Sequence, residues 1–202
     1  MSLSHSPQIV RDGLILCVDP DNMRSYNGSG ISILNLVDGT SQTLNGTFSK
    51  PSLGIRLTNT NISGSSNISR LNINSYASIR TIGVWVNIVD NITGNYIFDA
   101  RNGAGADGYV WNGGIGSFWS GLSVNGQNKT TPTIGDSFAT GSWRFLTYES
   151  SASFTDNVTM FSRFTNIEGL NCTFGQILFY NRVLTNAEIN KNFNALKGRY
   201  SL

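Results

Sequence analysis

Carboxyl groups, which many hydrolases use as acid and base, are few in this sequence and scattered along it. The chain has 202 residues with 12 Asp and Glu residues in total. Its glutamates are Glu149, Glu168 and Glu188, each isolated from the others. Cleavage of a glycosidic bond needs two carboxyl groups that flank the bond at roughly 5–10 Å. No strand-like segment supplies such a pair, so we assign no catalytic residue and expect that the protein is not an enzyme.

Asp19 and Asp21 are the sequence's candidates for metal coordination. They follow an apolar run, and Ca²⁺ takes about six to eight oxygen ligands. An EF-hand loop beginning at Asp19 would need glycine at its sixth position, where Arg24 stands. We therefore expect the two carboxylates to cap turns, with calcium binding as the alternative. The sole histidine, His5, lies near the N-terminus, and its isolation argues against a zinc site or a His-based catalytic set.

Three aromatic residues stand in glycine- and asparagine-rich surroundings and are candidates for glycan contact: Tyr109, Trp111 and Trp119. Sugar rings stack on aromatic faces, and amides bind sugar hydroxyls. Aromatic residues at alternating strand positions, however, mostly belong to cores or interfaces. Both interpretations stay open for these three side chains.

The composition favours a β-protein. Charged residues make up 13% of the chain and the net charge is +2, while an average soluble domain has about 25% charged residues. Asn, Ser, Thr and Gly take their place, which suits strands and turns rather than long helices. Lys and Arg form no basic run, so we expect no nucleic-acid partner. No apolar run approaches the roughly 20 residues that span a bilayer, so we expect no membrane insertion.

About a dozen short strands separated by turn signals predict an all-β fold. We expect a jelly-roll sandwich of two antiparallel sheets, with the first strand paired to the last. Asn125-Gly126 is typical of a tight hairpin turn. One domain is predicted over residues 9–202, after a flexible tail at 1–8. The clearest strand segments are 14–19, 81–89, 95–100, 108–111, 142–149, 157–164 and 175–180.

The last residues predict one short helix that closes the sandwich. Thr185 and Glu188 have the spacing of a capping box. Gly198 stands where a left-handed C-cap is expected. We expect this helix to pack over the seam of the sheets. Its apolar stripe consists of Ile189, Phe193 and Leu196.

Cys17 and Cys172 are the two cysteines, and the expected strand pairing places them too far apart for a disulfide. We expect two buried, reduced thiols that act as small apolar residues. The N-terminal residues show no charged segment followed by an apolar run and a cleavage site, so we expect no secretory signal and synthesis in a cytoplasm.

Four segments carry a family resemblance: GLILCVDPDNMRSYNGSG, TIGVWVNI, GSWRFLTYE and GQILFYNRVLTNAEINKNFNALKGRY. Together they resemble concanavalin A-like, laminin-G-type jelly-roll domains. The final NALKGRY is similar to the endings of such domains in virion proteins of tailed bacteriophages. The matching positions are Tyr180, Asn181, Arg182, Leu184, Glu188, Ile189, Ala195, Leu196, Lys197, Gly198, Arg199 and Tyr200.

The resemblance implies a non-enzymatic virion structural protein, a capsid-decorating or tail- or fibre-associated module on the virion surface. It would dock on other virion proteins in several copies. The alternative is a carbohydrate-binding module that recognises host-surface glycans. A third hypothesis is a polysaccharide hydrolase, a chemistry that other concanavalin A-like folds host. Where the family often has acidic residues, this chain has Asn35 and Thr58, so we expect no cofactor.

Overall fold

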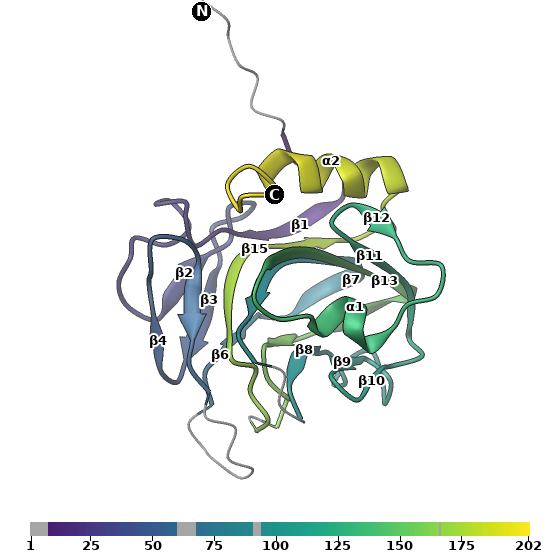
Figure 1. Cartoon of the computed structure of the whole chain (residues 1–202), viewed down its shortest axis with the longest axis horizontal. Coiled ribbons are helices and arrows are strands. Elements are labelled where there is room, and N and C mark those ends of the chain that lie inside the picture. The colour runs from purple at the N-terminus through teal and green to yellow at the C-terminus, as the bar shows by residue number, and fades with distance from the viewer. Residues whose placement is uncertain (1–7, 60–67, 91–93, 166) are drawn as a thin grey trace, which may run out of the picture.

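Two antiparallel sheets face each other across an apolar core, and one helix covers the outer side of the larger sheet (Figure 1). The structure is a computed structural model and describes residues 8–59, 68–90, 94–165 and 167–202. The predicted all-β sandwich with a short C-terminal helix is confirmed. The predicted flexible tail at 1–8, with His5, lies outside the described residues except for Gln8.

The larger sheet has eight strands in the described part of the chain, in the order β12-β11-β13-β7-β15-β5-β4, and β1 pairs with β15 beside β5. Two long strands, β7 and β13, form its centre, because both are rich in β-branched and aromatic residues. The strands are β1 (Leu14–Val18), β4 (Phe48–Ser49), β5 (Ile55–Leu57), β7 (Tyr76–Ile88), β11 (Trp119–Val124), β12 (Gln127–Asn128), β13 (Trp143–Asp156) and β15 (Cys172–Tyr180).

The smaller sheet has seven described strands in the order β10-β9-β8-β14-β6-β3-β2. The strand predicted at 157–164 is shorter than expected, because Phe161 adopts φ 67° and ends it. The strands are β2 (Ser32–Leu34), β3 (Ser41–Asn45), β6 (Arg70–Asn72), β8 (Tyr96–Asp99), β9 (Tyr109–Trp111), β10 (Gly114–Ile115) and β14 (Thr159–Met160).

The first and last strands pair as predicted. β1 runs antiparallel to β15, with Leu14 opposite Tyr180 and Val18 opposite Ile177. Cys17 lies opposite Leu178 in this register. Both cysteines are free and buried, and Cys172 lies at the other end of β15, where it pairs with β5. The predicted hairpins also form: β8 pairs with β9, and Asn125-Gly126 joins β11 to β12 with both residues at positive φ.

Helix α2 (Asn186–Leu196) begins with the predicted capping box. The Glu188 amide donates to Thr185 Oγ1 (3.3 Å), and the Thr185 amide donates to Glu188 Oε2 (2.9 Å). The predicted stripe also packs inward: Ile189 is fully buried in a second apolar cluster, against which Phe193 and Leu196 pack.

The predicted position of α2 over a sheet seam is corrected. Along β7, Val84 and Val86 face the main core, while Trp85 between them joins the second cluster with α2. Alternate residues of a strand point to opposite faces, so this cluster lies on the outer face of the eight-stranded sheet. Phe193 of α2 stacks on Trp85 with ring centroids 5.7 Å apart. Figure 1 shows α2 lying along β1 and β15.

The prediction of a left-handed C-cap at Gly198 is wrong. Lys197 ends the helix in right-handed conformation, and the chain continues in turns until Ser201, whose φ is 59°. These turns carry the ring of Tyr200 onto Trp85 and Trp143, with centroids 4.3 and 4.5 Å away. The residue with left-handed backbone conformation is therefore Ser201, which follows Tyr200, and not Gly198.

Helix α1 (Ile134–Phe138) was not predicted from the sequence, and it is only five residues long. It also begins with a capping box, formed by Thr133 and Asp136, and buries Phe138 at the edge of the main core. Neither helix of the described chain has the length and apolar character needed to cross a bilayer.

Candidate functional site

The outer face of the seven-stranded sheet carries a row of polar side chains on adjacent strands. Thr43 lies opposite Asn72, Asn72 opposite Thr159, and Thr159 opposite Asp99. Their neighbours along the same strands are buried in the main core, so the polar row points away from it. These buried neighbours are Leu44, Leu71, Met160 and Phe98.

A groove of about 400 Å³ opens over this row. We call it the amide groove, because asparagines dominate its polar lining. Strands β3, β6 and β14 supply its floor, and loops after β8 and β13 supply its wall. Its polar lining residues are Thr43, Asn72, Asn74, Asn102, Asn157 and Thr159, and its apolar ones are Ile73, Val158 and Phe164.

Most polar groups of the amide groove are not engaged within the protein. Among the described residues, the side chains of Thr43, Asn102, Asn157 and Thr159 have no hydrogen-bond partner. Asn72 Oδ1 accepts from Arg70 Nε (3.2 Å), which leaves its Nδ2 group without a partner in the same part of the chain. These donors and acceptors are free for the hydroxyl groups of a ligand.

An arginine–aromatic cluster borders the groove at Phe164. The guanidinium of Arg101 lies over the rings of Tyr96, Tyr109 and Phe164, at 5.6, 5.1 and 5.2 Å from their centroids. Trp111 stacks on Tyr96 with centroids 5.8 Å apart. Contacts of this kind restrict the motion of the rings, so Arg101 holds the ring of Phe164 in a fixed position at the groove.

Asp99 holds this cluster together from inside the sheet. Its fully buried carboxylate accepts from Arg101 Nε (3.0 Å) and Nη2 (2.5 Å), and from the backbone amide of Phe164 (3.1 Å). The hydrogen bond with Asp99 raises the pKa of Arg101 further above its ordinary value. The ion pair therefore positions both the arginine and the backbone at Phe164.

Asp156 lies close to the groove wall formed by Asn102 and Asn157. Its side chain is 4% exposed, and burial raises its pKa, an effect that the backbone amides of Gly103 and Asn157 partly offset. The loop after β8 approaches β13 so closely that a Cβ on Gly103 would lie 1.8 Å from the Thr155 carbonyl oxygen. This contact fixes the loop that presents Asn102.

None of the carboxyl groups that the structure describes lines the amide groove. Asp99 is enclosed in its ion pair and Asp156 is buried, and neither lines the amide groove. Within the described residues, no three His, Cys, Asp or Glu side chains gather as a metal site would require. The groove itself presents amides, hydroxyls and one aromatic ring.

The aromatic candidates from the sequence separate into two groups. Tyr109 and Trp111 are half-buried on β9, beside the arginine–aromatic cluster on the outer face of the seven-stranded sheet. Trp119 is 7% exposed and packs edge-to-face against Phe98 in the main core, which corrects its prediction as a glycan contact. The alternation of strand β11 points its ring inward, so it has no free face for a sugar.

Asp19 and Asp21, the two candidate calcium ligands, both form ion pairs within the protein. Asp19 accepts from Arg199 Nη1 with both oxygens at 2.8 Å. Asp21 accepts from Lys50 Nζ (2.8 Å) and from the amide of Gly54 (2.8 Å). The Asp21 amide also donates to Asp19 Oδ1 (3.1 Å), which is the expected turn-capping role.

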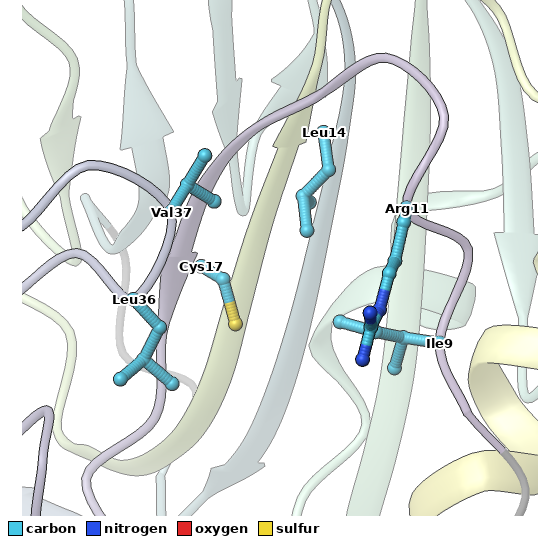
Figure 2. A pocket seen from close by; sticks show the side chains of 6 residues that line it. All are labelled: Ile9, Arg11, Leu14, Cys17, Leu36 and Val37. Carbon is cyan, nitrogen blue, oxygen red and sulfur yellow. The ribbon is translucent and has the colours of Figure 1, made fainter.

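A second groove, of about 440 Å³, lies on the opposite outer face, beside β1. Figure 2 shows Arg11 beside Ile9 at one end, Leu36 and Val37 at the other, and Cys17 between them. Burial raises the pKa of Cys17 to about 12, so its thiol stays protonated at neutral pH and is a poor nucleophile. This apolar groove offers few polar groups that could orient a ligand.

No family model matches the chain, and no curated protein matches it. Solved structures, however, match the chain. A Trypanosoma rangeli sialidase in complex with 2,3-difluorosialic acid, a covalent intermediate, matches with TM-score 0.56 at 12% identity. A mutant of that sialidase displaying trans-sialidase activity matches with TM-score 0.55 at 10% identity, and the sialidase in complex with sialic acid with TM-score 0.51 at 11% identity.

The fold of this chain matches about a third of each of these sialidase chains. The three matches cover 97%, 92% and 92% of this chain but only 36%, 33% and 33% of the sialidase chains. This chain therefore spans about a third of their length. At 10–12% identity the likeness shows the fold alone.

The comparison corrects the predicted function. The residues and motifs of the chain predicted a non-enzymatic structural protein of a phage virion, yet the three matched structures are those of a sialidase. The two antiparallel sheets fit the predicted jelly-roll-like sandwich, but the predicted link between this chain and phage virions has no support. A short C-terminal motif such as NALKGRY specifies how α2 and Tyr200 pack on the sheet, and this packing is a property of the fold.

Proposed function

We propose that this protein is a carbohydrate-binding β-sandwich module that holds a saccharide in the amide groove. The observation that carries the proposal is the set of unengaged hydroxyl and amide groups that Thr43, Asn72, Asn102, Asn157 and Thr159 turn into one groove. Phe164 supplies an aromatic ring at its border. A concanavalin A-like, laminin-G-like family membership is part of the same proposal.

The lining matches the chemistry of a sugar. Saccharides present many hydroxyl groups, each both a donor and an acceptor, around rings with apolar C–H faces. Asn side chains supply both donors and acceptors, and Thr hydroxyls do the same. Aromatic rings at binding sites pack on apolar ligand surface while the polar groups fix orientation. The strands beneath hold Thr43, Asn72 and Thr159 in register, so little ordering is needed on binding.

The fold comparison supports a carbohydrate ligand without defining it. One of the matched sialidases is in complex with sialic acid, and solved structures of this fold thus include proteins that bind saccharides. Because this chain spans a third of such a protein, the proposal extends to binding and not to hydrolysis. The enclosed Asp99 and the buried Asp156 also favour a module without catalysis.

A glycan array followed by calorimetry tests the proposal. We expect specific saccharide binding, and we expect Asn72→Ala and Phe164→Ala each to weaken it. A lost hydrogen bond or stacked ring is worth about 1 kcal/mol, or roughly fivefold in affinity. Asn128→Ala on β12, in the other sheet, is the matched control and should leave binding unchanged.

Two results would contradict the proposal. One is the absence of binding to any saccharide by the folded protein. The other is saccharide binding that Asn72→Ala and Phe164→Ala leave intact, because the ligand would then lie elsewhere.

A further inference from the structure

We infer that the amide groove selects neutral saccharides and excludes acidic ones such as sialic acid. This inference rests on the proposed function and narrows its ligand class. It also runs against a direct transfer of ligand from the structural matches, one of which is in complex with sialic acid.

The first reason is the lining itself. Its polar residues are asparagine and threonine, which carry no charge at any pH of interest, and the rest are Ile73, Val158 and Phe164. A sugar carboxylate that enters a groove must exchange its hydration for an opposite charge or for several hydrogen bonds. Among the residues that the structure describes, the groove lining offers hydrogen bonds but no ionised side chain.

The second reason is that Arg101, whose guanidinium lies over the ring of the groove residue Phe164, is already neutralised. Arg101 donates from Nε and Nη2 to both oxygens of Asp99, and three aromatic rings surround its guanidinium. The Arg101 side chain is 18% exposed. An incoming carboxylate would have to compete with Asp99, which is fully buried and would be left without its partner.

The other cations near the groove are engaged as well. Arg163 pairs with Glu168 at 3.3 Å. Arg70 donates from Nη1 to the Ile68 carbonyl (3.0 Å) and from Nε to Asn72 Oδ1 (3.2 Å). Arg70 thereby holds the Asn72 amide oxygen and leaves the Nδ2 group available as a donor, while Arg70 itself is not among the lining residues of the groove.

The carboxyl group of Asp156 lies behind the groove wall. Asp156 is buried next to the positions of Asn102 and Asn157, and Asp99 is close enough to raise its pKa further. A second carboxylate, brought by a ligand, would add repulsion at this place. The geometry, the lining and the paired cations all favour an uncharged sugar.

Calorimetry with matched oligosaccharides tests the inference. Each neutral saccharide that binds is compared with the same saccharide bearing one sialic acid. We expect the sialylated form to bind at least tenfold more weakly. We expect the neutral form to change less than twofold in affinity between about 0.01 and 1 M ionic strength, where the Debye length falls from about 30 to 3 Å.

A gain-of-charge variant supplies an independent readout. Asn157→Lys places a cation in the exposed wall of the groove. We expect it to improve the affinity for the sialylated form relative to the neutral form by several-fold, in a salt-dependent manner. Asn128→Lys, far from the groove, is the control and should leave the ratio unchanged.

The outcomes separate the two proposals. Tighter, salt-sensitive binding of sialylated saccharides by the wild-type protein would overturn the inference and leave the carbohydrate-binding function standing. An unchanged ratio in Asn157→Lys would overturn it too, because the ligand's acid would then not approach the groove. If the folded protein bound neither neutral nor acidic saccharides, the proposed function itself would fail.

Discussion

In the proposed saccharide site, Asn72 is a side chain that the protein itself holds in place. It lies between Thr43 and Thr159 in the cross-strand register, and Arg70 holds its amide oxygen at 3.2 Å. The Nδ2 group then remains as a donor toward the groove. Because the side chain is fixed before a ligand arrives, the entropic cost of ordering it is already met in the fold.

Replacing this donor without changing its shape gives the first prediction. Asn72→Asp keeps an acceptor for Arg70 but removes the two N–H donors and adds a charge to the groove. We expect saccharide affinity to fall about tenfold while the melting temperature stays the same or rises, because the new carboxylate pairs with Arg70. Calorimetry and thermal unfolding measure the two effects, and Asn128→Asp on β12, in the other sheet, is the control.

An Asn72→Asp protein with unchanged affinity would contradict the role given to the amide. A large fall in melting temperature would instead show that the substitution disturbs the sheet.

Tyr200 illustrates a residue whose role is structural. Its ring stacks on Trp85 and packs in a tilted arrangement against Trp143, and its hydroxyl oxygen accepts from the Gln176 amide at 3.2 Å. A Cβ on Gly175 would lie 2.1 Å from that hydroxyl, so glycine is required beneath it. Tyr200 is 2% exposed, and it closes the second apolar cluster.

We therefore expect Tyr200→Ala to lower the free energy of unfolding by about 3–5 kcal/mol, the usual cost of deleting a large buried ring. Denaturant unfolding measures it. Leu202→Ala removes a side chain that is 46% exposed and should change stability by less than about 0.5 kcal/mol. Equal effects of the two substitutions would contradict the packing described here.

At the scale of elements, helix α2 is fixed at its N-terminus by charge. Glu188 closes the capping box and also binds Arg182 through two hydrogen bonds of 2.9 and 2.6 Å. The hydrogen bond from Arg182 and the Thr185 amide lower the pKa of Glu188 from 4.5 to about 2. The folded state thus binds the proton of Glu188 less readily than the unfolded state does.

The sign of the pH effect follows from that shift. Because the pKa is lower in the folded state, the stabilisation from Glu188 is complete above its ordinary pKa of 4.5 and is lost as the pH falls toward 2. Glu188→Gln keeps the capping geometry but removes the charge. We expect the melting temperatures of the wild type and of this variant to differ at neutral pH and to converge between pH 4.5 and 2.

Asp136 in the α1 capping box also has a pKa lowered to about 2, so acid destabilises both proteins through it. The difference between the two melting curves isolates Glu188. A difference that stayed constant over the whole pH range would contradict the proposed ion pair.

The elements that the sequence predicted well are those whose signals are local. The capping box at Thr185, the Asn125-Gly126 turn and the first and last strands each depend on a few adjacent residues. The errors concern tertiary packing. The face that α2 covers depends on Trp85, a residue in the middle of the chain. The expected C-cap at Gly198 does not form, because the chain continues in turns that bring Tyr200 into the second apolar cluster.

The amide groove could not be predicted for the same reason. Its polar residues come from positions 43, 72, 74, 102, 157 and 159, which only the sheet order brings together. In a chain rich in asparagine, a single Asn carries no signal. Tyr109 and Trp111 were singled out because two aromatics in a short segment are conspicuous, and they lie on β9 at the border of the same face. Trp119 had the same local signal but the opposite strand face.

At the scale of the whole molecule, the chain forms three layers with two unlike outer faces. Helix α2 covers part of the eight-stranded sheet, and the remainder of that face holds the apolar groove of Figure 2. The outer face of the seven-stranded sheet, away from α2 in Figure 1, carries the amide groove. The ion pair of Asp19 with Arg199 joins the loop after β1 to the C-terminal turns and so fixes the first face.

The separation of the two faces allows a direct test of where a saccharide binds. Backbone amide resonances of the isotope-labelled protein, followed during titration with the tightest neutral oligosaccharide, report each face independently. Thr43, Asn72, Asn102, Asn157 and Thr159 represent the amide groove, and Leu14, Cys17, Leu36 and Val37 represent the apolar groove. We predict shifts at the first set and none at the second. Shifts confined to the apolar groove, or no shift with any saccharide, would contradict the account.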